Sequence, residues 1–318
     1  MKKMTGDKII SSAAFLCLFA LTVFIGCAKE DKAKAPPLKE SADDVYSVFV
    51  TIQPLESIAA SIAGDRAVIH VLLPPGADPH TYEPTPGDVK NLEDSAILFH
   101  IGMGLDDWAA KIALAAKDGP RIYPVAAGVP SLPAVPERMR RSLKAGGKMP
   151  AHGNPHVWLD PNVMATIIIP TMARAFAAAD PPNTEFYMKN ASRISKRIEA
   201  FSENAMSKLE PFAGKSVILH HGSFIYFFRR YNIKVIDILE PFPGQEPSPK
   251  ELKNIIESAK KKEAVAIFSE PQVSPKPAMI IADELNIPIV DVDPLGQAGE
   301  DYIELMERNL NAIATGLE

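Results

Sequence analysis

The sequence predicts an α/β protein of two successive (βα)4 lobes, each with a four-stranded, mainly parallel sheet, joined by one long rigid helix. Eight short apolar runs rich in β-branched residues alternate with helical segments along the chain. Their apolar character is continuous, which is typical of strands that are buried on both faces of a parallel sheet. One long amphipathic stretch separates the first four runs from the last four.

The eight predicted strands divide equally between an N-terminal lobe, residues 45–182, and a C-terminal lobe, residues 213–318. They occupy residues 46–52, 67–73, 96–101, 121–125, 216–221, 234–239, 264–268 and 287–292. Four helices between them have a recognisable start, in which a capping oxygen precedes a proline at the first helical position. These starts are Thr85-Pro86, Asp160-Pro161, Ser248-Pro249 and Ser274-Pro275.

Residues 183–212 predict the linking helix. Apolar side chains recur there at spacings of three and four residues, and prolines bound the stretch on both sides. At 1.5 Å per residue such a helix is roughly 40 Å long. A single long helix as the only crossing resists wide hinge bending, so we expect a stiff clamp.

The N-terminus predicts export and lipid attachment. Lys2, Lys3 and Lys8 precede an apolar run at residues 9–25 that ends at Gly26-Cys27. This pattern indicates a lipoprotein signal peptide over residues 1–26, with Cys27 as the lipidated first residue of the mature chain. Because the run approaches the roughly 20 residues of a spanning helix, an uncleaved membrane anchor is the alternative. Either reading places the rest of the chain outside the cytoplasm. The polar residues 27–44 predict a flexible tether.

Composition excludes a nucleic-acid-binding protein and a protein stabilised by disulfides. Removing residues 1–26 changes the formal net charge from −5 to −7, and no basic tract suggests a nucleic acid partner. Cys17 leaves with the signal and Cys27 carries lipid, so no cysteine remains for a disulfide framework.

Four stretches place metal-ligating side chains in turns at the carboxyl ends of predicted strands, where ligands bind in open α/β sheets. The donors are His80 and His156 in the first lobe and His221 and Asp293 in the second. Three imidazoles and one carboxylate form a tetrahedral set that suits Zn²⁺. The sequence therefore predicts one metal site at the interface of the lobes.

Two of these histidines have competitors beside them. We prefer His156 to His152 because His152 follows a segment rich in Gly and Lys. At His220-His221 strand alternation sends the two side chains to opposite faces, so only one of them can point at the site.

Asp293 is preferred to Asp291 because it lies beyond the predicted strand end and opens a turn. Glu270 ends another strand at the same edge, either as an acceptor from a ligand histidine N–H or as a carboxylate at a helix start. His70 and His100 lie inside apolar strands and are expected to be packed residues.

These motifs resemble the metal-binding lipoproteins of ABC importers for zinc and manganese, the cluster A-I (ZnuA/TroA-like) solute-binding family. The resemblance covers the chain from Tyr46 to the C-terminus and implies a pair of (βα)4 lobes with the ion between them. Carried over residue by residue, it assigns the metal to the same four donors, His80, His156, His221 and Asp293. The matching stretches are residues 74–86, 155–161, 221–224, 270–275 and 293–296.

Two departures from the family pattern bear on the metal. Many relatives have His-Asp-Ala-Phe in the third motif, whereas this chain has Gly222-Ser223 in the middle. Many zinc-specific members carry a long His- and acid-rich loop, whereas residues 129–153 contain only His152 and are basic. The histidine at position 221 nevertheless favours Zn²⁺, with Mn²⁺ or Fe²⁺ as the alternative cargo.

The resemblance also implies a membrane permease and its ATPase as partners, and we expect a monomer. Affinity is expected to fall below about pH 6.5, because protons compete for imidazole. A zinc metallohydrolase and an adhesin are the competing functions. An enzyme needs an open coordination position and a general base, and the sequence contains no HExxH motif.

Overall fold

The structure is a computed structural model that describes residues 45–134, 153–241 and 244–318. The predicted signal peptide, the lipidation site at Cys27, the tether and His152 lie outside these residues.

The first lobe contains a four-stranded parallel sheet with strand order β2-β1-β3-β4. Its elements are β1 (Tyr46–Val50), α1 (Gln53–Ala63), η1 (Gly64–Arg66), β2 (Ala67–Val71), α2 (Pro86–Leu92), β3 (Ile97–His100), α3 (Asp107–Ala115) and β4 (Arg121–Pro124). A helical segment follows, made of η2 (Val157–Leu159), α5 (Pro161–Val163), the π-helical η3 (Met164–Ile168), α6 (Ile169–Ala179) and η4 (Pro181–Asn183).

The second lobe repeats the arrangement, with strand order β6-β5-β7-β8, again parallel throughout. Its elements are η5 (Glu210–Phe212), β5 (Ser216–Leu219), α8 (Ile225–Arg230), β6 (Lys234–Ile238), α9 (Pro249–Lys262), β7 (Ala264–Ser269), α10 (Lys276–Leu285), β8 (Ile289–Asp291) and α11 (Tyr302–Leu317). The predicted fold class, with two four-stranded parallel sheets, is confirmed.

Both sheets are covered on two faces, as their continuous apolar strands predict. In the first sheet, Phe49 and Leu98 pack with α2 and α3, whereas Val48 and Phe99 point to the opposite face. In the second sheet, one face packs on α9 and α10. The other faces of the two sheets contribute to one continuous apolar core that also includes α1, α6, α7 and α11. The lobes therefore share a core.

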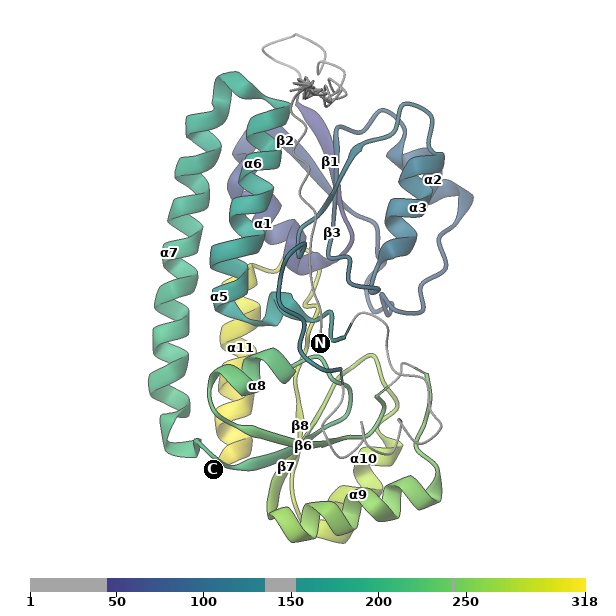
Figure 1. Cartoon of the computed structure of the whole chain (residues 1–318), viewed down its shortest axis with the longest axis vertical. Coiled ribbons are helices and arrows are strands. Elements are labelled where there is room, and N and C mark those ends of the chain that lie inside the picture. The colour runs from purple at the N-terminus through teal and green to yellow at the C-terminus, as the bar shows by residue number, and fades with distance from the viewer. Residues whose placement is uncertain (1–44, 135–152, 242–243) are drawn as a thin grey trace, which may run out of the picture. The chain divides into compact units, whose positions relative to one another are not determined.

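The long helix α7 (Thr184–Leu209) lies along this shared core (Figure 1). It packs against α1 and α6 of the first lobe and against α11 of the second. Its buried side chains are spaced three and four residues apart, from Tyr187 to Leu209. The predicted linking helix is thus present, and neighbours from both lobes support it along its length.

The segment Pro161–Ala179 is apolar enough and long enough to cross a bilayer, yet more than half of it is buried inside the protein. It packs against α7, which makes it a core helix. Its π-helical turn comes just before Pro170, which has no backbone N–H to continue the regular ladder.

Three of the four predicted helix starts have proline at the first position. Asp160 accepts two backbone N–H bonds at the start of α5, and Ser248 forms a capping box with Glu251 at α9. The fourth prediction was wrong by one residue, because α10 begins at Lys276 and Pro275 occupies the capping position. No side chain caps that helix, which explains why its boundary is poorly specified by sequence.

Candidate metal site

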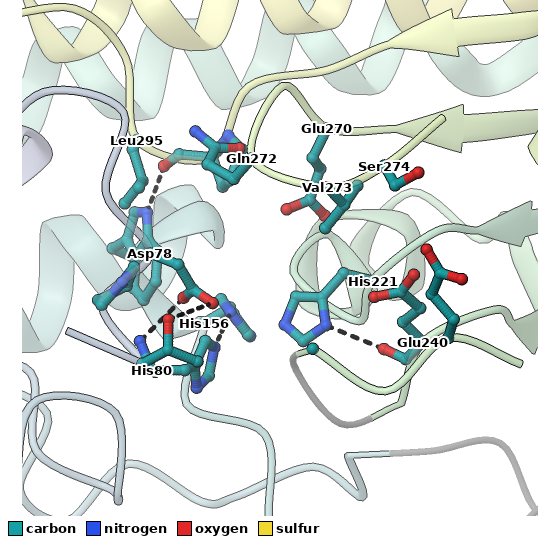
Figure 2. Close-up of a pocket in the computed structure, with 16 residues that line it drawn as sticks. Asp78, His80, His156, His221, Glu240, Glu270, Gln272, Val273, Ser274 and Leu295 are labelled. Carbon is teal, nitrogen blue, oxygen red and sulfur yellow. Dashed lines mark hydrogen bonds between the residues drawn. The ribbon is translucent and has the colours of Figure 1, made fainter. Parts of the chain in front are cut away.

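A cavity of about 330 Å³ lies at the carboxyl ends of the strands, where the loops of the two lobes meet (Figure 2). Its lining includes four carboxylate residues and no Lys or Arg among the described residues. The acidic members are Asp78, Glu240, Glu246 and Glu270. An acidic, partly enclosed cavity raises the local concentration of cations.

His80 reaches the cavity from the loop between β2 and α2. The Asp78 carboxylate accepts the backbone N–H of His80 at 2.9 Å, and the indole N–H of Trp108 donates to the carbonyl of Pro79 at 3.1 Å. These bonds hold the loop at His80 and just before it, so less conformational entropy is lost when His80 binds a ligand.

His156 lies in the turn before η2 and is buried. Its Nε2 is 3.1 Å from Nε2 of His80. The next two residues, Val157 and Trp158, have no exposed surface. The ring therefore projects from a part of the first lobe that is fixed by packing.

His221 reaches the same point from the end of β5 in the second lobe. Its Nδ1 is 3.1 Å from the backbone carbonyl of Glu240, which can only accept, so Nδ1 carries the proton. Its Nε2 is buried and has no hydrogen-bond partner among the described residues. An unpaired lone pair in a buried position is costly unless something binds it.

His80, His156 and His221 each offer one ring nitrogen, and the three nitrogens lie within 4.8 Å of one another. Burial, and to a smaller extent the neighbouring His221, lowers the pKa of His80 to about 3. Burial and the same clustering place the pKa of His156 well below its usual value. Both rings are therefore neutral near pH 7, which is the state that binds a metal.

Asp293 lies at the same edge of the second sheet but outside this group of three nitrogens. Its Oδ1 accepts the N–H groups of Leu295 and Gly296, each at 3.0 Å, and Arg308 contacts its Oδ2 at 3.3 Å. The side chain of Asn309 donates to the Asp293 carbonyl and accepts its N–H. The carboxylate is thus held in place by its own turn and by α11.

Glu270 lines the cavity and is buried. The hydroxyl of Ser223 donates to its Oε1 at 2.5 Å, so its partner in the structure is a serine and not a histidine N–H. Burial raises the pKa of Glu270, and the nearby His221 opposes the rise. The substitution at position 223 of the third motif therefore supplies support for this carboxyl group.

His220 points away from the cavity, as the alternation along β5 predicts. Its Nε2 is 3.3 Å from Oε1 of Glu240, and its Nδ1 is 3.2 Å from the hydroxyl of Ser269. It is fully buried, and this burial lowers its pKa. His220 therefore belongs to the interior of the second lobe.

The structure also places the two strand histidines. His70 stacks on Phe49 with ring centroids 4.8 Å apart. His100 approaches Asp106 and Asp107, but the Asp106 carboxylate already accepts the hydroxyl of Thr51 and two backbone N–H groups after β3. These bonds give Asp106 a structural role.

Sequence reasoning missed several residues that shape the site. Glu240 orients His221 through its carbonyl, and Arg308 contacts Asp293. Trp158 donates its indole N–H to the carbonyl of Pro294 in the other lobe at 2.8 Å. A carbonyl acceptor has no sequence signal, so only the tertiary structure reveals such contacts.

Comparisons with known proteins identify the family of this chain. The family model described as "Zinc-uptake complex component A periplasmic", ZnuA, matches residues 48–316. The manganese ABC transporter substrate-binding lipoprotein PsaA of Streptococcus mitis is 27% identical over 95% of this chain and 97% of its own length. The metal ABC transporter substrate-binding lipoprotein SloC of Streptococcus mutans is 28% identical, over 98% and 99%.

Solved structures show the same likeness. A crystal structure of ZnuA superposes with a TM-score of 0.75 at 29% identity, covering 86% of this chain and all of that one. The binding protein FpvC of Pseudomonas aeruginosa, solved with Mn²⁺, has a TM-score of 0.74 at 28% identity, covering 86% and 98%. The relatives are substrate-binding components of transporters and not enzymes. The chain therefore belongs to the ZnuA family and is a metal-binding, substrate-binding protein of an ABC transporter.

Proposed function

We propose that this protein captures Zn²⁺ outside the cytoplasm and delivers it to an ABC importer. The observation that carries the proposal is the convergence of three ring nitrogens, from both lobes, within 4.8 Å of one another. Burial keeps the rings of His80 and His156 neutral, and Nε2 of His221 has no partner in the part of the chain that the structure describes.

The donor set favours Zn²⁺ over Mn²⁺. Imidazole nitrogen suits zinc, whereas manganese prefers more oxygen ligands, and the usual order of affinity also places zinc above manganese. We assign the fourth position to Asp293, which lies at the same edge of the second sheet with its Oδ2 in contact with Arg308. Glu270 stands beside the site as a buried carboxyl group that supports it.

The proposed partners follow from the transport role. The loaded protein docks on a membrane permease driven by an ATPase, and a lipid on Cys27 keeps it near that complex. We propose that it acts as a monomer, because all four donors come from one chain.

Metal analysis of protein purified without chelator, followed by competition between Zn²⁺ and Mn²⁺, tests the proposal. We expect bound zinc, a tighter zinc complex, and a loss of affinity by orders of magnitude in His221→Ala. The matched control is His70→Ala, which removes an imidazole that packs on Phe49 outside the site.

The outcomes separate the parts of the proposal. A preference for manganese would change the cargo and leave the transport role. Unchanged zinc affinity in His221→Ala would show that zinc does not bind at the interface between the lobes.

A further inference from the structure

Asn154 joins the metal-binding loops of the two lobes. Its side-chain amide Nδ2 donates to the backbone carbonyl of Gly222 at 2.6 Å, and Gly222 directly follows His221. Its Oδ1 accepts the backbone N–H of His156 at 2.9 Å and lies 3.1 Å from Nδ1 of that ring. One side chain, with 1% of its surface exposed, thus contacts the segments that carry two of the three histidines.

The partner of the NH₂ group of Asn154 determines the orientation of the whole side-chain amide. The carbonyl of Gly222 can only accept, so the amide NH₂ must face it. Oδ1 then faces His156 and can only accept from that ring. The proton of His156 therefore lies on Nδ1, and Nε2 has a lone pair directed towards His80, whose Nε2 is 3.1 Å away.

Packing at Gly222 supports the same contact. A Cβ at this position would lie 3.3 Å from Nδ2 of Asn154 and 3.2 Å from the carbonyl oxygen of Ala134. The close approach of backbone to amide therefore favours glycine. In addition, the hydroxyl of Tyr226 in the second lobe donates to the backbone carbonyl of Asn154 at 2.9 Å.

We propose that Asn154 is a positioning residue that ties the ligand loop of one lobe to that of the other and holds His156 as the Nδ1–H tautomer. This inference rests on the proposed function, because it assigns Asn154 a role in preparing the metal site. The hydrogen bond to a backbone carbonyl in one lobe thereby sets which ring nitrogen the other lobe presents to the ion. Groups that orient ligand histidines in this way typically change metal affinity by about 10–100-fold when they are removed.

The first test needs no metal and no substitution at Asn154. Long-range ¹⁵N–¹H NMR of the metal-free wild-type protein, with the His156 signal assigned by its loss in His156→Gln, reports which nitrogen carries the proton. We expect the Nδ1–H tautomer. An Nε2–H tautomer would overturn the inference.

The second test compares two variants at position 154. Asn154→Leu removes both hydrogen bonds, and we expect it to lose the single Nδ1–H tautomer. Asn154→Asp keeps an acceptor that faces His156 but loses the donor to Gly222. We therefore expect this variant to show the Nδ1–H tautomer that Asn154→Leu loses. If Asn154→Leu keeps the wild-type signal, or if Asn154→Asp fails to restore it, the assigned role is wrong.

Zinc affinity completes the test with a matched control. Asn190 makes the same kind of bond far from the site, from its Nδ2 to the carbonyl of Ile62 at 3.0 Å. We expect Asn154→Leu to weaken zinc binding roughly 10–100-fold, whereas Asn190→Leu leaves it unchanged. Equal effects in the two variants would show a general structural role and overturn the inference. A wild-type protein that shows the Nδ1–H tautomer but binds no zinc would refute the proposed function alone.

Discussion

Arg308 holds one oxygen of Asp293: its Nη2 lies 3.3 Å from Oδ2, while the same guanidinium bonds to the Glu300 carboxylate. The other oxygen, Oδ1, belongs to the turn and accepts the N–H groups of Leu295 and Gly296. One carboxylate oxygen of Asp293 therefore holds the turn, and the guanidinium of Arg308 already balances the charge at the other. A metal ion in the site would compete with Arg308 for Oδ2.

Asp293→Asn tests whether this carboxylate binds the ion. Asparagine keeps the oxygen that accepts from the turn and removes the negative charge. We expect zinc affinity to fall at least about tenfold, as for loss of a charged ligand or its close support, measured by competition with a chromophoric chelator. The control is Asp291→Asn, at the exposed end of β8. Wild-type affinity in Asp293→Asn would show that water, not Asp293, completes the coordination.

Arg308→Met tests the competition for Oδ2. Methionine keeps most of the length of the side chain and removes the positive charge, so Oδ2 becomes free for the ion. We expect zinc to bind several-fold more tightly and to dissociate more slowly in stopped-flow exchange with chelator, because opposite charges attract more strongly without the competing cation.

The control for Arg308→Met is Arg197→Met, which removes the same charge from a pair with Asp301. Weaker zinc binding in Arg308→Met would instead mean that Arg308 is needed to keep Asp293 in position.

Substitution of His220 should lower the stability of the metal-free protein much more than substitution of His221. His220→Leu removes the neutral imidazole that contacts the buried Glu240 side chain, so we expect a loss of roughly 1–3 kcal/mol in the free energy of unfolding. His221→Ala removes a ring whose Nε2 is unpaired within residues 45–134, 153–241 and 244–318, so the metal-free stability should change by less than about 1 kcal/mol. Urea unfolding in chelator measures both.

Zinc then separates the two variants further. At zinc concentrations about 100 times the dissociation constant, binding should stabilise the wild-type protein by about 2.7 kcal/mol. His221→Ala should lose this gain, whereas any His220→Leu protein that folds should keep it. If His220→Leu lost the gain and His221→Ala kept it, His220 and not His221 would be the zinc ligand.

The sequence was enough to predict the strands because each buried run, such as Ala264–Ser269, is apolar on both faces. It was also enough to single out the three histidines, because turn residues surround each of them. It was insufficient for Asn154 and Arg308, whose partners are a backbone carbonyl and a carboxylate brought near by folding. Asn154 directly precedes the motif at residues 155–161, yet its contact with Gly222 depends on how the lobes approach each other.

The structure also revises the expected effect of pH on zinc binding. The free histidine value predicts that protons compete below about pH 6.5. Burial lowers the pKa of His80 to about 3, so this ring stays unprotonated at pH 5.5, and burial also places the pKa of His156 well below its usual value. The zinc affinities measured at pH 7.5 and at pH 5.5 should therefore differ less than they would at a site made of free imidazoles. A loss of more than about tenfold per pH unit would contradict the buried, neutral rings.

Acid should instead destabilise the metal-free fold. The unfolded chain binds protons on His80 and His156 below about pH 6.5, whereas the folded protein does not until much lower pH. The unfolded state therefore holds more protons between these values, and the free energy of unfolding falls as pH drops, by up to about 1.4 kcal/mol per pH unit for each ring. His80→Asn removes one of the two contributions. Urea unfolding in chelator at pH 7 and pH 5 should show a smaller loss in this variant than in the wild type, and equal losses would mean that His80 is protonated in the folded protein.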